Sequence, residues 1–204
     1  MSKNPIIVFE GIEGSGKSLH INNVANYLKK INRKFIRIRE PGGSKDSEKI
    51  RKLILDNKSS FNVNTDLLLY MSARSENINL IKKNYKKKII LIDRFVDSTI
   101  AYQHYGFGVD IKIINLINKF LLQNIKVTFT FLNIVSLKNM NNRLKKRKKL
   151  NRYDKFNTVF YNKVQKGFLD ILKKKKNKYL KVNSNLEINL NKKLIINKIK
   201  KLIK

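Results

Sequence analysis

Short runs of β-branched and apolar residues alternate along the chain with longer stretches in which apolar residues recur every three or four positions. The first pattern predicts β-strands and the second predicts amphipathic helices. Strands are expected over Ile6–Phe9, Lys34–Ile38, Ile89–Ile92, Val127–Leu132 and Tyr179–Val182. Helices are expected over Lys17–Lys30, Asp66–Ile81, Ile111–Leu122 and Leu190–Lys204. The alternation predicts an α/β fold with a parallel five-stranded sheet flanked by helices.

The 204 residues are expected to form one domain, because they contain no internal repeat and no linker rich in proline, glycine or serine. Ile89–Ile92 is wholly apolar, as befits a strand that is covered on both faces. The C-terminal helix should dock on the sheet through one apolar face made of Leu194, Ile195, Ile199, Leu202 and Ile203.

The composition narrows the class of protein further. A hydrophobic content of 42% is too high for a disordered chain, and the absence of cysteine excludes disulfides and thiolate metal sites. The first strand starts near Pro5, which leaves no room for a signal peptide, and no apolar run has the length of a membrane span. A cytoplasmic protein without membrane contact is therefore expected.

The net charge of +32 comes from 46 basic and 14 acidic residues. Such a charge favours binding to polyanions such as nucleic acid. A dedicated nucleic-acid module, however, concentrates its charge in one arm or stripe with aromatic residues between. Here the lysines are spread over nearly every segment, as in Lys82–Lys88 and Lys198–Lys204. We therefore interpret the charge as a general feature of the composition, and no specific nucleic-acid partner is expected.

A phosphate-binding loop follows the first strand and precedes the first helix. The motif G-x-x-x-x-G-K-[ST] is matched in full by Gly11, Ile12, Glu13, Gly14, Ser15, Gly16, Lys17 and Ser18. Glycines let backbone N–H groups converge on phosphate oxygens at the positive end of the helix. Lys17 is expected to reach the β- and γ-phosphates, and the Ser18 hydroxyl to bind Mg²⁺. The motif predicts ATP binding but does not identify the second substrate.

Asp93 and Arg94 end the apolar third strand. An aspartate at this place can hold Mg²⁺ or its water, and the planar guanidinium of arginine suits a phosphate. In isolation such a pair is more commonly a surface ion pair. Next to a phosphate-binding loop, at the edge of the sheet where ligands bind, a role in the site is favoured.

Three further segments carry motifs: residues 39–43 read R-E-P-G-G, residues 67–74 read L-L-L-Y-M-S-A-R, and residues 93–103 read D-R-F-V-D-S-T-I-A-Y-Q. Together with the phosphate-binding loop, in this order and over essentially the whole chain, these segments resemble the thymidylate kinases. Residues 93–103 match the family signature D-R-[FYH]-x-x-S-x-x-A-Y-Q, residues 39–43 resemble its R-E-P-G-G loop, and residues 67–74 are similar to the helix that presents an aromatic residue and an arginine to thymine. The resemblance implies ATP-dependent phosphorylation of dTMP to dTDP by a P-loop nucleoside monophosphate kinase, and a homodimer.

The resemblance also implies contacts with the thymine base. Tyr70 is expected to stack on the pyrimidine, where the family usually has phenylalanine, and Arg74 to donate to the thymine carbonyl edge. Ser98 and Gln103 are candidates for the remaining base contacts. Taken alone, Tyr70 would fit a core aromatic residue and Arg74 a solvated helix residue.

For the sugar and phosphate of dTMP, the resemblance implies four further residues. Tyr102 would pack against the deoxyribose, although it could also be a core aromatic, and Glu13 would accept from the 3′-hydroxyl. Arg39 and Arg94 would hold the phosphate group.

A basic segment within residues 137–154 lies where the family has its mobile helical lid. One branch of the family has an arginine within the phosphate-binding loop, whereas the bacterial branch has glycine there and supplies arginines from the lid. Gly14 and the lid arginines therefore resemble the bacterial branch. Arg147 is expected to reach the transferring phosphoryl group, with Arg143 as the alternative on the same helix face and Arg152 anchoring the lid.

Two positions depart from the family pattern. Asn151 replaces a common acid, which is expected to remove a local ion pair and loosen the lid. Leu19 replaces a threonine and is expected to weaken ATP binding modestly. Two other functions remain open at this point: a nucleoside monophosphate kinase with another acceptor, and a basic nucleic-acid-binding NTPase.

Overall fold

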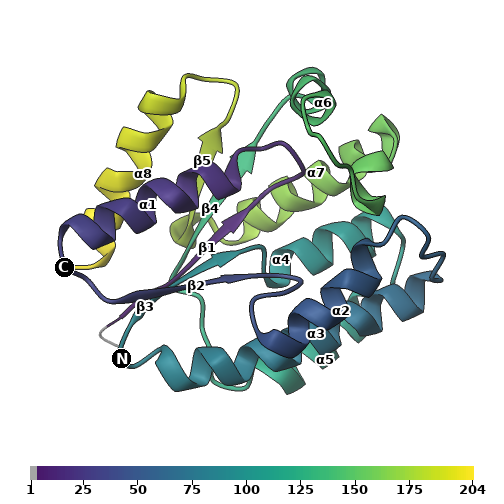
Figure 1. Ribbon diagram of the computed structural model, residues 1–204, viewed down its shortest axis with the longest axis horizontal. Coiled ribbons are helices and arrows are strands. Elements are labelled where there is room, and N and C mark those ends of the chain that lie inside the picture. Colours follow the sequence, from purple (N-terminus) through teal and green to yellow (C-terminus); the bar gives the residue numbers. More distant parts are fainter. Residues whose placement is uncertain (1–3) are drawn as a thin grey trace.

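The computed structural model describes residues 4–204. Five parallel strands form one sheet in the order β2-β3-β1-β4-β5 (Figure 1), which confirms the predicted fold class. The strands are β1 (Ile6–Glu10), β2 (Phe35–Arg39), β3 (Ile89–Asp93), β4 (Phe129–Ile134) and β5 (Tyr179–Asn183).

The predicted fourth strand is placed two residues too early. Asn133 and Ile134 continue the pairing of β4 with β5, opposite Val182 and Asn183. The polar Asn133 interrupts the apolar run of β4, so the sequence pattern ends the strand before it. The side chain of Asn133 is nevertheless buried, because β4 lies inside the sheet.

Eight α-helices are assigned within residues 4–204: α1 (Lys17–Lys30), α2 (Lys45–Leu55), α3 (Val63–Asn84), α4 (Val96–Thr99), α5 (Ile111–Leu122), α6 (Leu137–Lys145), α7 (Thr158–Lys174) and α8 (Ile188–Leu202). A π-helix, η1 (Ile100–Gly106), continues α4, and two 3-10 turns, η2 (Arg152–Lys155) and η3 (Lys176–Lys178), flank α7. The sequence pattern predicts neither α2 nor α7. In α2 only Ser47 and Ile54 are buried, so its apolar stripe is too thin to stand out.

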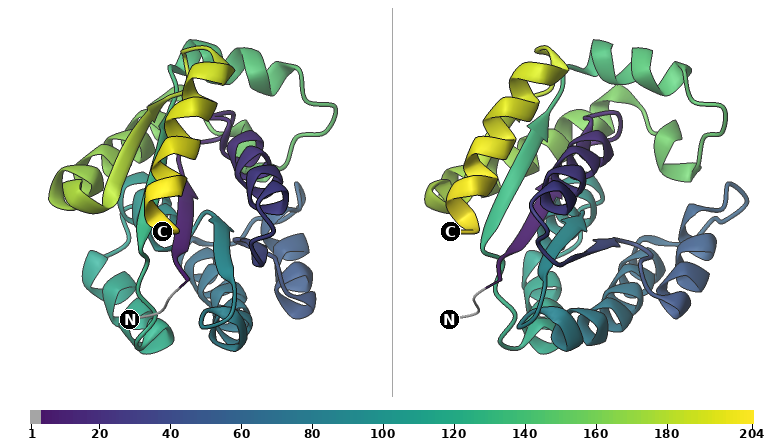
Figure 2. Two further views of the ribbon diagram at one scale, coloured as in Figure 1. Left: turned by 90° about the vertical axis from the view of Figure 1, so that its left-hand side faces the viewer. Right: turned by 60° about the vertical axis from the view of Figure 1, so that its left-hand side comes forward.

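Helices cover both faces of the sheet (Figures 1 and 2). On one face α1 and α8 pack side by side, and Ile195 and Ile199 of α8 reach the core as predicted. Leu194, predicted on the same apolar face, is 43% exposed, and Ile196 packs against the core instead. The other face is covered by α3, α4, η1 and α7.

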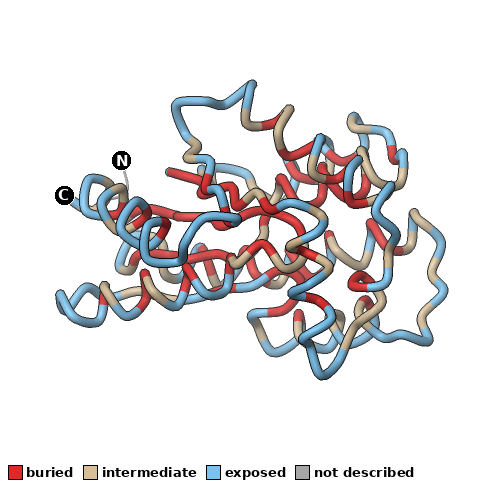
Figure 3. Tube along the Cα trace, turned by 90° about the horizontal axis from the view of Figure 1, so that it is seen from above, coloured by how far each residue is buried: buried red, intermediate tan, exposed pale blue. Residues whose placement is uncertain are grey.

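All five strands end at the same edge of the sheet, because they are parallel. Buried residues follow the central strands, whereas the loops are mostly exposed (Figure 3). The phosphate-binding loop leaves β1 at this edge, and the segments after β2, β3 and β4 converge around it. Within residues 4–204, no helix combines the length and apolar character needed to cross a membrane.

Candidate active site

A cavity of about 400 Å³ lies at the carboxyl edge of the sheet. Most of the residues expected at the site line it: Glu13, Gly14, Ser15, Gly16, Lys17, Ser18, Arg39, Tyr70, Arg74, Asp93, Arg94, Ser98, Tyr102, Gln103, Arg143 and Arg147. Gly11 and Ile12 do not line it, since Ile12 is buried in the core below the loop. Tertiary structure thus brings five separate segments of sequence around one cavity.

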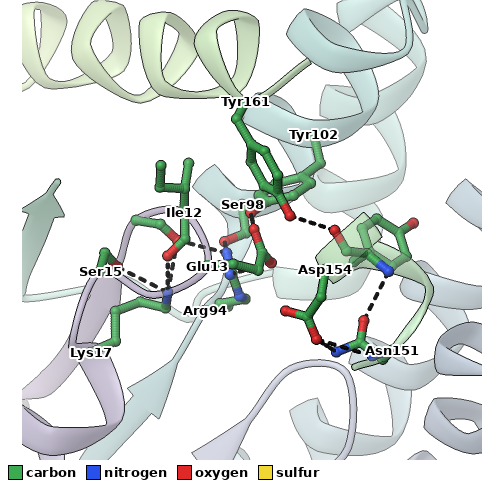
Figure 4. A network of polar contacts seen from close by, with 12 residues as sticks. Ile12, Glu13, Ser15, Lys17, Arg94, Ser98, Tyr102, Asn151, Asp154 and Tyr161 are labelled. Carbon is green, nitrogen blue, oxygen red and sulfur yellow. Dashed lines mark hydrogen bonds and ion pairs between the residues drawn. The ribbon is translucent and has the colours of Figure 1, made fainter. Parts of the chain in front are cut away.

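The phosphate-binding loop leaves the start of α1 open to an anion. Gly16, the residue before the helix, has a φ of +83° and offers no side-chain cap to the first N–H groups of α1. The Lys17 ammonium donates to the carbonyl oxygens of Gly11 and Ile12, both at 2.8 Å, and to Ser15 Oγ at 3.3 Å (Figure 4). Burial, together with the positive charge of Arg94, lowers the pKa of Lys17 to about 7. A bound polyphosphate would restore the charged form.

Close packing explains why glycine is required in this loop. A Cβ at Gly11 would lie 2.2 Å from the carbonyl oxygen of Asn133 in β4. Gly14 has a φ of +65°, and a Cβ there would lie 3.3 Å from the carbonyl oxygen of Met140 in α6. The helix α6 therefore covers the loop where another branch of the family has an arginine. Arg143 of α6 strengthens this contact by donating to the carbonyl oxygens of Gly14 at 2.8 Å and Ser184 at 2.6 Å.

Arg94 has a left-handed backbone, with a φ of +64°, and its guanidinium is held in place on several sides. Its Nη1 donates to Gly11 O at 2.7 Å and to Ser98 Oγ at 3.3 Å, and its Nη2 donates to Glu13 Oε1 at 2.7 Å. The group also lies 5.1 Å from the centre of the Tyr102 ring, and the Tyr102 hydroxyl donates to Glu13 Oε2 (Figure 4). Among the described residues, the Nε–H of Arg94 has no acceptor, so a donor remains for a phosphate in the cavity.

Glu10, at the end of β1, is a residue that sequence reasoning missed. It is fully buried, and its Oε1 accepts from the backbone N–H of Phe95 at 2.8 Å and of Ser98 at 3.3 Å. Its Oε2 accepts from the Ser98 hydroxyl at 2.5 Å. The hydroxyl hydrogen of Ser98 is thus donated to Glu10, and the hydroxyl oxygen accepts from Arg94. In this structure Ser98 therefore positions Arg94 and has no hydrogen left to donate to a base. A charged residue that directly follows a buried apolar strand is the signal that could have found Glu10.

Burial and the nearby charge of Asp97 raise the pKa of Glu10 to about 7. A carboxyl group with a raised pKa binds its proton more tightly in the folded protein than in the unfolded chain. The resulting stabilisation is complete below pH 4.5 and disappears as the pH rises toward 7. The full effect is roughly 3 kcal/mol, because each tenfold change in proton affinity corresponds to about 1.4 kcal/mol.

The Glu10→Gln variant, which resembles the protonated form, should lack this dependence. We expect the unfolding free energy of the wild type to fall relative to that of the variant between pH 5 and pH 7. Urea unfolding of both proteins at several pH values measures the difference. Parallel pH profiles of the two proteins would contradict the assignment.

The lining of the cavity also contains the residues expected to contact a base: Tyr70, Arg74, Ser98 and Gln103. Tyr70 packs edge-on against Tyr153, with ring centres 5.8 Å apart, and burial raises the pKa of Tyr70, so its hydroxyl stays neutral. Gln103 is 1% exposed, and within residues 4–204 its Nε2 has no hydrogen-bond partner. Arg74 is also buried, which excludes the solvated helix residue that its sequence position allows.

Two arginines lie beside the β2–α2 turn. Arg39, expected on the dTMP phosphate, forms a bidentate ion pair with Glu48 of α2, at 3.0 and 2.9 Å, and its side chain is 55% exposed. Arg51, one turn after Glu48, lines the cavity and donates to the Pro41 carbonyl oxygen at 2.5 Å. Arg51 escaped prediction because the sequence pattern did not reveal α2.

The lid differs from expectation in two respects. The helix α6 ends at Lys145, so Arg147 lies in the following loop and does not share a helix face with Arg143. Arg147 donates to Asp154 Oδ1 at 2.5 Å, while Asp154 Oδ2 accepts from the backbone N–H of Asn151 at 3.0 Å. Asn151 caps the turn η2 in a reciprocal capping box with Asp154, so it forms local contacts in the segment where a loss of contacts was expected.

Arg152 connects the lid to the start of α3. Its Nη2 donates to Asp66 Oδ1 at 2.5 Å, and the neighbouring Tyr153 hydroxyl donates to Asp66 Oδ2 at 3.3 Å. Asp66 precedes Tyr70 by one turn of α3. The end of the lid is therefore bound to the same helix that places Tyr70 in the cavity. Leu19, the other departure from the family pattern, lines the cavity and is 40% exposed.

Comparison with known proteins agrees with this geometry. A sequence model of the family described as "Thymidylate kinase" matches residues 9–195. The thymidylate kinase of Thermosipho africanus is 36% identical over 176 residues, covering 85% of this chain and 87% of the relative. That of Wolbachia pipientis wMel is 41% identical over 170 residues, covering 81% and 83%.

A solved structure leads to the same family. The crystal structure of thymidylate kinase from Ehrlichia chaffeensis superposes with a TM-score of 0.77 at 31% sequence identity. The superposition covers 97% of this chain and 98% of the other. The fold, the sequence match and the arrangement of the cavity agree, and the chain belongs to the thymidylate kinase family.

Proposed function

We propose that the protein transfers the γ-phosphoryl group of ATP to dTMP and releases ADP and dTDP. The observation that carries this proposal is the single cavity in which the phosphate-binding loop, Arg94 and the buried base-side residues meet. Phosphoryl transfer depends mainly on placing two phosphates in line and stabilising the charge between them. Related chains over most of this sequence carry the name thymidylate kinase.

On the ATP side, the open N-terminus of α1 and the Lys17 ammonium would hold the β- and γ-phosphates. On the acceptor side, Arg94 would bind the dTMP phosphate through its remaining donors, with Arg39 and Arg51 nearby. The phosphate oxygen of dTMP then attacks the γ-phosphorus as the bond to the β-phosphate oxygen breaks. No covalent intermediate with the protein is required.

The nucleoside of dTMP would fill the side of the cavity beyond Arg94. Tyr70 would stack on the pyrimidine, Gln103 would use its unpartnered amide, and Arg74 would face a base carbonyl. Tyr102 would lie against the deoxyribose. In this structure Glu13 accepts hydrogen bonds from Arg94 and Tyr102. The 3′-hydroxyl of dTMP would donate to Glu13 beside these two contacts or in place of one of them.

Magnesium would accompany ATP, and two residues suit it. The Ser18 hydroxyl donates to Asp93 Oδ2 at 2.9 Å, so two hard oxygen ligands already lie together beside the phosphate-binding loop. Within residues 4–204 there is no cluster of three or more His, Cys, Asp or Glu side chains that could hold a metal alone. Mg²⁺ commonly takes one or two protein ligands and completes its shell with water and substrate phosphates. When bound, it would neutralise charge on the transferring phosphates.

The acceptor is tested by measuring ADP release with dTMP, dUMP, CMP, AMP and GMP. We expect dTMP to give the highest kcat/KM. A clear preference for CMP, AMP or GMP would identify another nucleoside monophosphate kinase. ATP hydrolysis that requires added DNA and no monophosphate would instead favour a nucleic-acid-binding NTPase.

We further propose that the protein is a homodimer that associates through α5. The apolar side chains of Ile113, Leu116 and Phe120 recur on one side of α5 and are 50%, 69% and 75% exposed. Leu68 of α3, which packs beside α5, is 58% exposed. A row of exposed apolar side chains of this kind marks an interaction surface.

The Phe120→Glu variant is expected to be monomeric, because it places a charge at the most exposed of these apolar positions. Light scattering coupled to gel filtration should give 24.0 kDa for the variant and about twice that mass for the wild type. Leu190→Glu, on α8 against the other face of the sheet, is the matched control and should remain dimeric. A wild type of 24.0 kDa, or a dimeric Phe120→Glu variant, would contradict this interface.

A further inference from the structure

Glu40 and Arg74 form a buried ion pair in the wall of the cavity. Their side chains are 5% and 1% exposed, and both residues line the cavity. The Nε and Nη2 of Arg74 donate to the same oxygen, Glu40 Oε2, at 2.8 and 2.7 Å. The two residues come from different segments, the turn after β2 and the middle of α3.

Further contacts fix the guanidinium of Arg74. Its Nη1 donates to Asn118 Oδ1 of α5 at 2.7 Å, and its Nη2 donates to Thr99 Oγ1 of α4 at 2.9 Å. One face lies 5.2 Å from the centre of the Phe95 ring. Four of the five N–H groups thus reach oxygen atoms, and neither the position nor the tilt of the group is free to change.

The fifth N–H group of Arg74, on Nη1, has only a weak acceptor. Its neighbour is the sulfur of Met71, at 3.7 Å. A thioether is a poor hydrogen-bond acceptor compared with a carbonyl oxygen. A ligand that brings a carbonyl oxygen to this wall of the cavity would therefore gain a charge-assisted hydrogen bond.

The ion pair is not explained by stability. A buried ion pair loses the hydration of both charges, and apolar residues of similar size are often as stable. Glu40 is also incompletely satisfied, since its Oε1 is buried without a hydrogen-bond partner among residues 4–204. Burial accordingly raises the pKa of Glu40. A costly, incompletely satisfied charge at a cavity wall is typical of a functional site.

We propose that Glu40 is a specificity-determining positioning residue, which fixes Arg74 so that its remaining N–H donates to a carbonyl oxygen at C4 of the pyrimidine. This inference rests on the proposed function, in which Arg74 faces a base carbonyl, and adds the residue that holds Arg74 in place for that contact. Thymine and uracil carry a carbonyl oxygen at C4, whereas cytosine carries an amino group. An amino group at this place would meet the N–H of Arg74 donor to donor, and both would be left without an acceptor.

The test compares kcat/KM for dTMP and dCMP in the wild type and in Glu40→Gln, with the KM for ATP measured alongside. Glu40→Gln keeps the shape of the side chain but removes the charge that holds Arg74. We expect the ratio of kcat/KM for dTMP to that for dCMP to fall at least about tenfold. Most of the loss with dTMP should appear as a higher KM, while the KM for ATP stays within about twofold.

Two further variants make the test decisive. Glu40→Asp keeps a negative charge beside Arg74 but withdraws the carboxylate by one methylene. It should therefore lower the dTMP-to-dCMP ratio of kcat/KM as well, and it keeps the proposal testable if Glu40→Gln does not fold. Asp46→Asn removes an exposed carboxylate that pairs with Lys49 at 2.7 Å, and it should leave the ratio unchanged.

Distinct outcomes overturn the two proposals. If the wild type phosphorylates dTMP and the folded Glu40 variants keep its dTMP-to-dCMP ratio within about twofold, the role of Glu40 is wrong while the proposed function stands. An equal fall with both acceptors would likewise assign Glu40 a structural role alone. A wild type that does not phosphorylate dTMP would overturn both proposals.

Discussion

The Lys17→Met variant is expected to lose at least ~10³-fold in kcat and to keep its fold. Lys17 is the buried lysine of the phosphate-binding loop, and its removal would take away the positive charge proposed to act on the β- and γ-phosphates. The fold should survive, because burial already lowers the pKa of Lys17 to about 7 in the free protein. A side chain that is easily discharged in the free protein can be replaced by an apolar one of similar length at small cost.

Coupled ADP release measures kcat of this variant, and thermal unfolding checks its fold. Lys30→Met, in the exposed last turn of α1, is the matched control and should retain wild-type activity. A normally folded Lys17→Met enzyme with more than about a tenth of wild-type kcat would refute the assignment of the phosphate-binding loop.

The Arg147→Ala variant is expected to lower kcat by about 10²–10³-fold, with a smaller rise in either KM. Three arginines occur in the lid, and their contacts differ. Arg143 donates to two backbone carbonyls and Arg152 pairs with the buried Asp66. Arg147 lines the cavity, is 41% exposed, and has Asp154 as its ion-pair partner. It can therefore exchange Asp154 for a phosphoryl group that gains charge in the transition state.

The measurement is kcat and both KM values for Arg147→Ala, Arg143→Ala and Arg152→Ala. Lys145→Ala and Lys148→Ala are controls, since both lysines are exposed, and each should cost far less. If Arg147→Ala behaves like the lysine variants while Arg143→Ala or Arg152→Ala loses activity, the assignment of Arg147 is wrong. The catalytic role then belongs to the arginine whose replacement abolishes activity.

Local sequence patterns were enough to predict the sheet, the phosphate-binding loop and the family. Apolar periodicity shows in a short window, and the motif of residues 11–18 needs only a strand before it and a helix after it. The bounds of α1 and α5 follow the prediction for the same reason. Where the local signal is thin, as in α2, or interrupted, as at Asn133, the prediction fails.

The groups that hold the site residues in place became known only from the packing of the folded chain. Glu10 meets Ser98 across 88 positions, Arg152 meets Asp66 across 86, and Arg74 meets Glu40 across 34. A local pattern can mark a buried acid, as the end of an apolar run marks Glu10, but it does not identify the partner, because strand order and helix packing decide which residues meet. The free energy of a buried charge depends on its desolvation and on those partners. For this reason the sequence alone identifies Arg74, Arg94 and Ser98 as candidate site residues. Only the folded structure shows which of their hydrogen-bonding groups are not already paired within the protein and are available to a substrate.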